Sequence, residues 1–195
     1  RALALMEEAR TGYQEIQGFC AEFFQELVVP LLNDTTRSTG RLCQRHPDLF
    51  SMRFSEPEGD ALVADGEFFW VYYPSTDPGQ VLRFSLERRP GGVDFQEEFL
   101  DAPGEKYRLT YLGQETVDGH SSHRIGATPR VESGFEDAVL WLDAERSLIR
   151  RIRMEMENGS VRTLALRDIR LNPEVDQALF TFTPPPGAQV IRRTP

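Results

Sequence analysis

The sequence predicts a mainly β protein of the α+β class, in which a single twisted antiparallel sheet forms a half-open barrel covered by two short helices. Three observations support this prediction. Apolar and polar residues alternate with period two over most of the chain after Gly18. Turn dipeptides such as Asp65-Gly66, Asp118-Gly119 and Asn158-Gly159 separate the runs at hairpin spacing. Only two segments have helical spacing, and we expect one domain over residues 1–195.

The two helical segments lie at the start and near the middle of the chain. Residues 1–13 carry Leu3, Met6 and Ala9 at helical spacing, and Gly12 is a plausible stop. Between residues 90 and 104 the apolar residues again follow a helical pattern, after Gly91-Gly92. We expect an N-terminal helix and a short central helix.

Strands are predicted wherever side chains alternate. The segments are residues 19–28, 39–45, 49–55, 61–64, 68–73, 81–85, 107–112, 123–127, 137–142, 148–156, 161–169 and 179–183. In the last of them Phe180 and Phe182 share one face, and the prolines that follow end the pairing, because proline has no N–H to donate. Successive hairpins predict one long antiparallel meander.

A sheet of this length has a face that two short helices cannot cover tightly. An open barrel with the helices as a lid would leave an apolar hollow, which is a typical ligand site. The pattern is equally compatible with a filled core.

The net charge of −9 argues against nucleic acid as a partner, since binding to phosphates needs a basic surface. It also argues against electrostatic attachment to anionic lipid. The apolar stretches are too short to span a bilayer. No signal peptide is visible, and the chain begins at Arg1, so we expect a mature or trimmed chain from which any export signal is already absent.

The two cysteines, Cys20 and Cys43, suit an exported protein with one disulfide, or two buried thiols. If the first hairpin turns near Leu31-Leu32, the two cysteines lie opposite each other on the face away from Phe19 and Leu42. A cross-strand disulfide is then feasible, and we favour it over free thiols. A redox role is not indicated because no C-x-x-C motif is present.

One local cluster resembles a chemical site. Asp118, His120 and His123 could bind a metal, but in a strand the two histidines would face opposite ways, so a polar turn is favoured. The sequence has no catalytic or nucleotide-binding motif of the common kinds. We therefore expect no enzyme activity, cofactor or metal. Arg88-Arg89 and Arg150-Arg151 are expected to be solvated.

A series of short motifs runs along most of the chain. The first strand reads Phe19-Cys-Ala-Glu-Phe-Phe-Gln25, and the second contains Gly40-Arg-Leu-Cys-Gln-Arg-His-Pro-Asp-Leu-Phe50. Asp65-Gly66, Trp70-Val-Tyr-Tyr-Pro74 and Gln80-Val81 follow, and the chain closes on Phe180-Thr-Phe-Thr-Pro-Pro-Pro-Gly187. In their order and spacing these motifs resemble the LolA family, periplasmic carriers of bacterial lipoproteins.

The resemblance implies a monomeric, non-enzymatic periplasmic carrier. Such a carrier takes acylated lipoproteins from an inner-membrane ABC-type complex and passes them to an outer-membrane acceptor, with at most transient membrane contact. Its cavity would shelter the acyl chains from water, since each buried methylene is worth about 0.8 kcal/mol. Two alternatives stay open on the same fold: a carrier of another lipid, such as a glycolipid or free acyl chain, and an acceptor resembling LolB.

On this reading we expect an apolar cavity built from both helices and many strands. Its lining is expected to be Leu5, Phe19, Ala21, Phe23, Leu42, Phe50, Met52, Phe54, Trp70, Tyr72, Phe95, Phe99, Leu140, Leu142, Phe180 and Phe182. A one-residue slip in any strand would reverse its faces. The family has an arginine before the proline at Pro47, expected to hold the lid shut, and here His46 stands there after Arg45. These two residues are the candidates for a lid latch.

The loop over residues 27–32, Leu-Val-Val-Pro-Leu-Leu, departs from the family. We expect its apolar side chains to pack under the lid or against the first helix. The alternative is a finger that touches a membrane or a partner, because exposed apolar patches are usually interaction sites. LolB has an apolar protruding loop elsewhere in its chain, which keeps the acceptor alternative open.

Overall fold

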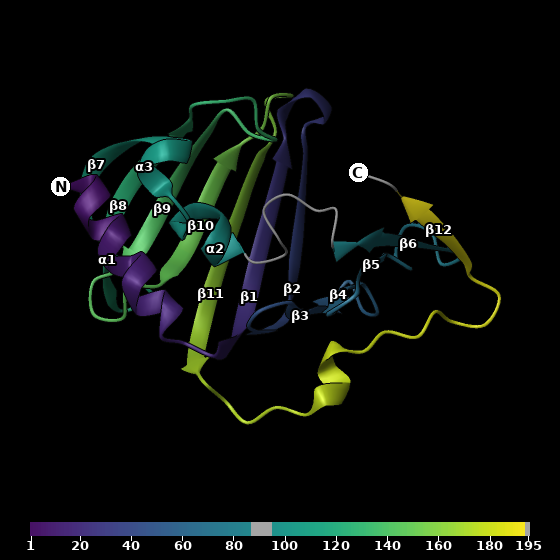
Figure 1. The fold of residues 1–195 in the computed structure, drawn as a ribbon. Coiled ribbons are helices and arrows are strands. Elements are labelled where there is room, and N and C mark those ends of the chain that lie inside the picture. Colours follow the sequence, from purple (N-terminus) through teal and green to yellow (C-terminus); the bar gives the residue numbers. More distant parts are fainter. Residues whose placement is uncertain (87–94, 194–195) are drawn as a thin grey trace. The chain divides into compact units, whose positions relative to one another are not determined.

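Strands in which apolar and polar side chains alternate make up most of this protein. The computed structural model describes residues 1–86 and 95–193, and for Phe95 and Arg193 it describes the backbone alone. Within these residues, twelve strands form one open sheet in the order β12-β6-β5-β4-β3-β2-β1-β11-β10-β9-β8-β7 (Figure 1). The prediction of a mainly β fold with a single open sheet and a few helices is confirmed.

The strands agree closely with the alternation in the sequence. They are β1 (Gly18–Val29), β2 (Asp34–Arg45), β3 (Leu49–Glu56), β4 (Ala61–Asp65), β5 (Phe68–Tyr72), β6 (Gln80–Ser85), β7 (Tyr107–Val117), β8 (His120–Pro129), β9 (Asp137–Asp143), β10 (Ile149–Glu155), β11 (Val161–Leu171) and β12 (Gln189–Arg193). Strands β2 and β7 extend about five residues beyond their predicted ends. β7 does so through a register shift between Tyr111 and Gly113, which interrupts the alternation that the prediction relied on.

The helices are α1 (Ala2–Gln14), α2 (Phe95–Leu100) and α3 (Pro103–Lys106), with short 3-10 turns η1 (Pro30–Leu32) and η3 (Gln177–Phe180). Helix α1 confirms the first predicted helix, and Met6, Ala9 and Tyr13 lie buried along one stripe. The single central helix that we predicted is two short helices, of which α3 begins at Pro103, a residue favoured in a first turn. The predicted start of that helix, before Phe95, lies outside the described residues.

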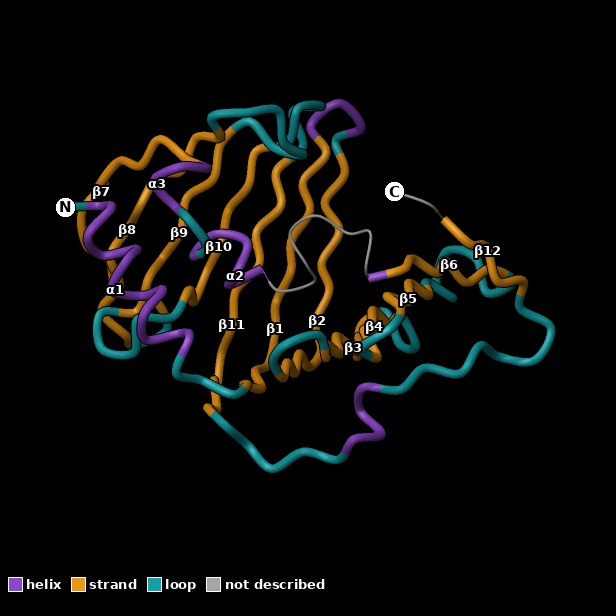
Figure 2. The backbone as a smooth tube through the Cα atoms, in the orientation of Figure 1, coloured by secondary structure: helices purple, strands orange, loops and turns teal. Residues whose placement is uncertain are grey.

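The predicted strand over residues 179–183 is wrong. Figure 2 shows a loop with one helical turn between β11 and β12. Asp176 caps this turn by accepting a hydrogen bond from the Ala178 N–H. The carbonyls of Leu179 and Thr181 accept hydrogen bonds from the Arg53 side chain instead of a neighbouring strand. The alternating phenylalanines therefore belong to an irregular segment held by side chains.

The last strand corrects the prediction of a purely antiparallel meander. β12 pairs with β6 in parallel, with Val190 opposite Val81. Between β11 and β12 the chain runs through residues 172–188, which we call the C-terminal arm. This connection is long enough to enter the sheet again at its edge beside β6, which a hairpin could not do.

The chain divides into two compact units. Unit 1 comprises residues 1–16, 24–37 and 96–167, and unit 2 comprises residues 17–23, 38–95 and 168–195. In unit 1, α1, α2 and α3 lie across one face of β7–β10 (Figure 1). The Gln96 side chain fixes α2 there, because it donates to the Ile149 carbonyl and accepts from the Ile149 N–H, each at 2.9 Å.

Gly40 permits a close approach of β2 and β3 in unit 2. A methyl group there would stand 2.1 Å from the Arg53 carbonyl oxygen and 2.7 Å from the Phe23 ring. Both are far below van der Waals contact, so Gly40→Ala should lower the free energy of unfolding by about 3 kcal/mol, measured by urea denaturation. Gly126→Ala in β8 is the control, since its methyl would have no neighbour closer than 3.5 Å. Equal losses in the two variants would contradict this account.

Candidate functional site

One face of the unit 2 sheet carries most of its aromatic rings. Cross-strand pairs share a face, and the registers place Phe50 opposite Ala64 and Ala64 opposite Phe69. We call this surface the phenylalanine face. It consists of Phe19, Ala21, Phe23, Leu42, Phe50, Met52, Phe54, Leu62 and Phe69.

The rings of the phenylalanine face contact one another. Phe23 meets Phe54 edge-on with centroids 5.0 Å apart, and Phe54 meets Tyr73 at 6.1 Å. Phe50 and Phe69 lie 6.5 Å apart. These are favourable aromatic geometries. Phe23, Phe54 and Phe50 are nearly inaccessible to solvent, whereas Tyr73 is exposed. The phenylalanine face is thus continuous and apolar, with the solvent-exposed Tyr73 at its margin.

A small hollow lies at that margin. Its volume is about 170 Å³, and it is lined by Val71, Tyr73, Thr76, Asp77, Gln80 and Leu82. Val71 lies opposite Leu62 in the register, so the hollow adjoins the phenylalanine face. An apolar chain could therefore extend along this face toward the sheet edge.

The opposite face of the same sheet binds the C-terminal arm, and here the expected cavity lining needs correction. Trp70 lies opposite Val63, so it shares a face with Val63 and Val81. Tyr72 and Phe182 pack against the same cluster, with rings 5.8 Å apart. The structure therefore places Trp70 and Tyr72 away from the phenylalanine face, because a residue's parity in its strand decides its face. Phe180 and Phe182 belong to the irregular C-terminal arm and pack against clusters on the arm-bearing face.

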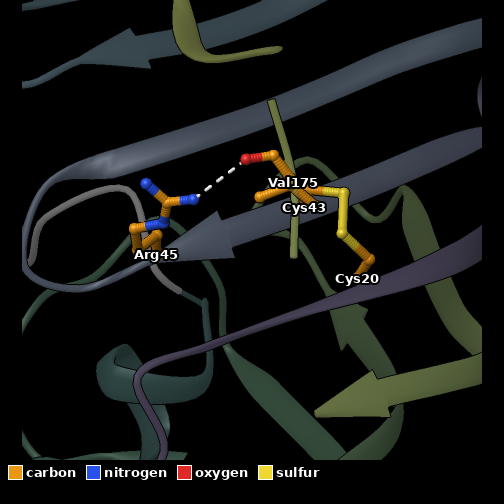
Figure 3. Close-up of a disulfide and its surroundings, with 4 residues drawn as sticks. All are labelled: Cys20, Cys43, Arg45 and Val175. Atoms are coloured by element: carbon orange, nitrogen blue, oxygen red, sulfur yellow. Dashed lines mark hydrogen bonds between the residues drawn. A yellow bond between two sulfur atoms is a disulfide. The ribbon is translucent and has the colours of Figure 1, made fainter. Parts of the chain in front are cut away.

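The disulfide between Cys20 and Cys43 lies on this arm-bearing face (Figure 3). The hairpin turns at Pro30–Leu32, which brings the two cysteines opposite each other. Phe180 is 1% exposed and packs against both cysteines. The disulfide thus closes the first hairpin and offers a fixed surface for the arm.

Arg45 holds the C-terminal arm. Its guanidinium donates to the Gln177 side chain at 3.1 Å. It also donates to the Val175 carbonyl at 3.2 Å, the bond drawn in Figure 3. It also lies over the Phe180 ring at 5.5 Å. These contacts tie Arg45 to the C-terminal arm. The other latch candidate, His46, is half-buried, and its backbone N–H donates to the Gln17 carbonyl.

Of the remaining expected lining residues, Leu5, Phe99, Leu140 and Leu142 fall in unit 1. Leu140 and Leu142 of β9 share a face with Ile125 of β8 and Ile152 of β10, and all four are nearly fully buried. Phe99 stacks on Tyr107 with centroids 5.5 Å apart. These residues form the core between helices and strands of unit 1. Leu5 is half-buried on α1, and the side chain of Phe95 lies outside the described residues.

The cluster around Asp118 forms a polar turn. Asp118 and Gly119 both have positive φ between β7 and β8, and the Asp118 carboxylate pairs with Arg167 at 3.0 Å. His123 Nδ1 lies 3.4 Å from the Tyr111 hydroxyl. Over residues 1–86 and 95–193, no three side chains of histidine, cysteine or acid gather as metal ligands would.

The tip of the first hairpin corrects the expectation that its leucines pack inside. Leu31 and Leu32 are 87% and 75% exposed. Asn33 takes a left-handed conformation at the end of η1, which turns the chain sharply after the two leucines. This tip is an exposed apolar projection. The described part of the chain contains no helix with the length and apolarity needed to span a membrane.

Comparison with known proteins identifies the family. The family model described as outer membrane lipoprotein carrier protein LolA matches residues 14–183. The chain belongs to the LolA family. Carriers of this family are periplasmic and non-enzymatic.

Curated relatives agree with the LolA assignment, and a solved structure shares the fold. An outer-membrane lipoprotein carrier protein of Chromohalobacter salexigens is 25% identical over 98% of this chain and 92% of its own length. One from Alkalilimnicola ehrlichii is 30% identical over 79% of this chain and 68% of its own. An uncharacterized conserved protein from Thermus thermophilus has the same fold, with a TM-score of 0.62 at 16% identity over 98% of this chain and 99% of that one.

Two polar residues of this LolA-family chain were not singled out from the sequence. Arg53 alternates with apolar neighbours, and the structure shows its guanidinium holding arm carbonyls. Gln44 follows Leu42 on the phenylalanine face and lies opposite Phe50. Both residues could have been found from the sequence as polar side chains at strand positions where the alternation predicts a buried residue.

Proposed function

We propose that this protein is a periplasmic carrier that shields the acyl chains of lipoproteins and moves them from the inner to the outer membrane. An inner-membrane ABC-type complex would load it, and an outer-membrane acceptor would unload it. Membership of the LolA family supports this function. The observation that carries it in the structure is the phenylalanine face, which offers contiguous apolar side chains for an acyl chain.

Soluble cargo complexes test the proposal. Purified protein is mixed with a triacylated lipopeptide, detergent is removed, and size exclusion with native mass spectrometry looks for a one-to-one complex. Leu62→Gln changes a half-buried position of the phenylalanine face, and we expect it to weaken the complex. Leu171→Gln, at a leucine exposed by 39% in the same unit, is the control. Precipitated lipopeptide beside an unloaded, folded protein would refute the proposal.

The same assay separates the lipoprotein carrier from a carrier of another lipid. If the protein carries another lipid, a diacyl lipid or a free acyl chain would form the stable complex, and the triacylated lipopeptide would not.

The exposed tip favours a second candidate, an acceptor that touches the membrane as LolB-like proteins are expected to do. Burying a leucine side chain is worth about 1.5–3 kcal/mol, so two leucines give a weak, reversible contact. Leu31→Ser with Leu32→Ser should therefore lower partitioning onto uncharged phosphatidylcholine vesicles by about tenfold or more, measured by co-flotation. Uncharged lipid is chosen because the chain carries a net charge of −9.

Val131→Ser is the control for the tip, since Val131 is 76% exposed at another site. A wild-type protein that does not float with vesicles would remove the acceptor reading and leave the soluble carrier in place.

A further inference from the structure

Gln44 is a polar residue set within the phenylalanine face. It lies opposite Phe50 in the pairing of β2 with β3. On its other side, the Cys20–Cys43 disulfide and the hydrogen bond from the His46 N–H to the Gln17 carbonyl fix the register, which brings Phe19 opposite Gln44. Leu42 precedes it on the same face. The primary amide of Gln44 thus lies on a face that carries apolar neighbours on β1, β2 and β3.

The side-chain oxygen of Gln44 is buried without a hydrogen-bond donor. The residue is 4% exposed, and within the described residues no group donates to its Oε1. A buried carbonyl oxygen without a donor is unfavourable, and a chain keeps such a group at low cost only when something else supplies the donor. An apolar residue would fill the position without this cost.

The location of Gln44 indicates which donor is missing. Gln44 is the second-last residue of β2, so the oxygen stands near the end of the apolar face. An acyl chain lying on that face has no donor of its own along its methylenes. Where an acyl chain is joined through an amide, the first donor beyond the methylenes is the amide N–H. An ester-linked chain has none.

We propose that Gln44 Oε1 accepts a hydrogen bond from the amide N–H of an N-acylated cargo and thereby selects amide-linked over ester-linked acyl chains. This inference rests on the proposed carrier function and adds to it the chemical class of the anchor. Apolar contacts supply affinity for any acyl chain, while the buried oxygen discriminates, because a ligand without the donor leaves it unpaired.

The test replaces the amide hydrogen of the cargo by a methyl group. The probes are a lipopeptide with an N-palmitoyl amide and the same lipopeptide methylated on that amide nitrogen. Their affinities for the intact protein are compared by displacement of a fluorescent fatty acid. We expect the wild-type protein to prefer the N–H form by about tenfold. Gln44→Leu, which fills the site without an acceptor, should bind both forms equally.

The variant also controls for the bulk of the added methyl group. A preference caused by bulk alone would persist in Gln44→Leu and would overturn the inference. Equal binding of both probes to the wild type would overturn the inference too, because a water molecule would then donate to Gln44 Oε1. That outcome would leave the carrier function in place. Failure of both lipopeptides to bind would refute the carrier function itself. The wild-type comparison needs no substitution, so a folding defect in the variant cannot mask the result.

Discussion

Replacement of Arg150 by methionine is expected to lower the free energy of unfolding by about 3–5 kcal/mol, because it leaves the Asp143 carboxylate buried without its cation. The Arg150 and Asp143 side chains are 3% and 1% exposed and form an ion pair. The expectation that Arg150 is solvated is therefore wrong. The register shift between Ile149 and Arg151 makes Arg150 the extra residue of a bulge, which turns its side chain onto Asp143.

Arg151→Met is the matched control for this prediction. Arg151 is half-buried and lies over the Trp141 ring at 5.5 Å, so its loss should cost less than about 1 kcal/mol. Urea denaturation of the two variants beside the wild type measures the difference. If both arginines contributed equally, the buried ion pair would not be the source of the stability.

The Arg150–Asp143 pair also predicts how stability depends on pH. Burial alone would raise the pKa of Asp143, but hydrogen bonds from the Glu145 N–H, the Arg150 guanidinium and the Arg146 N–H lower it below its ordinary 3.8. As pH falls, the unfolded chain takes up this proton before the folded protein does. The stabilising contribution is thus present above the ordinary pKa and lost below it. The gap between wild type and Arg150→Met should narrow in acid, and a constant gap would contradict this.

Phe180→Ala is expected to cost about 3–5 kcal/mol, the usual range for a large aromatic removed from a packed core. Phe180 is among the most buried residues of unit 2 and fills the space beside the disulfide, Leu49 and Val175. Its loss removes the main apolar anchor of the C-terminal arm, which would then be held by the hydrogen bonds from Arg45 and Arg53 and by the packing of Phe182. Hydrogen exchange at the amides of β12 should therefore also be faster.

Phe182→Ala serves as the comparison, since it changes the same residue type in the same arm. Phe182 is only partly buried, against Trp70 and Tyr72, so the expected loss is clearly smaller. Thermal and urea unfolding of both variants decide the matter. Equal losses would mean that the arm is held along its length and has no single anchor.

The two faces of the unit 2 sheet serve different purposes on this account. One face holds the arm through a disulfide-backed cluster and two arginines. The other presents phenylalanine rings with one buried amide, and the proposed cargo would lie there. A substitution on the arm-bearing face should therefore change stability first, and one on the phenylalanine face should change cargo binding first.

Much of this protein could be predicted from local pattern. Alternation located most of the strands, and Asp118-Gly119 and Asn158-Gly159 were correctly read as turns. The hairpin made a Cys20–Cys43 disulfide feasible, since its turn and its alternation are both encoded locally, and the expected oxidising compartment favoured it over free thiols. These features depend on backbone preferences within a few residues, which sequence expresses directly.

Contacts between distant segments were decided only by the tertiary structure. Phe180 and Phe182 alternate as strand residues do, yet side chains from β2 and β3 hold them in an irregular arm, because arginine donors replaced a neighbouring strand. The face of Trp70 depended on register across β3 to β5. Arg150 was buried by a bulge, and the tip leucines were left exposed by the absence of a covering segment among the described residues. Each of these placements depends on contacts between residues far apart in the sequence. The local alternation of apolar and polar residues does not reveal such contacts.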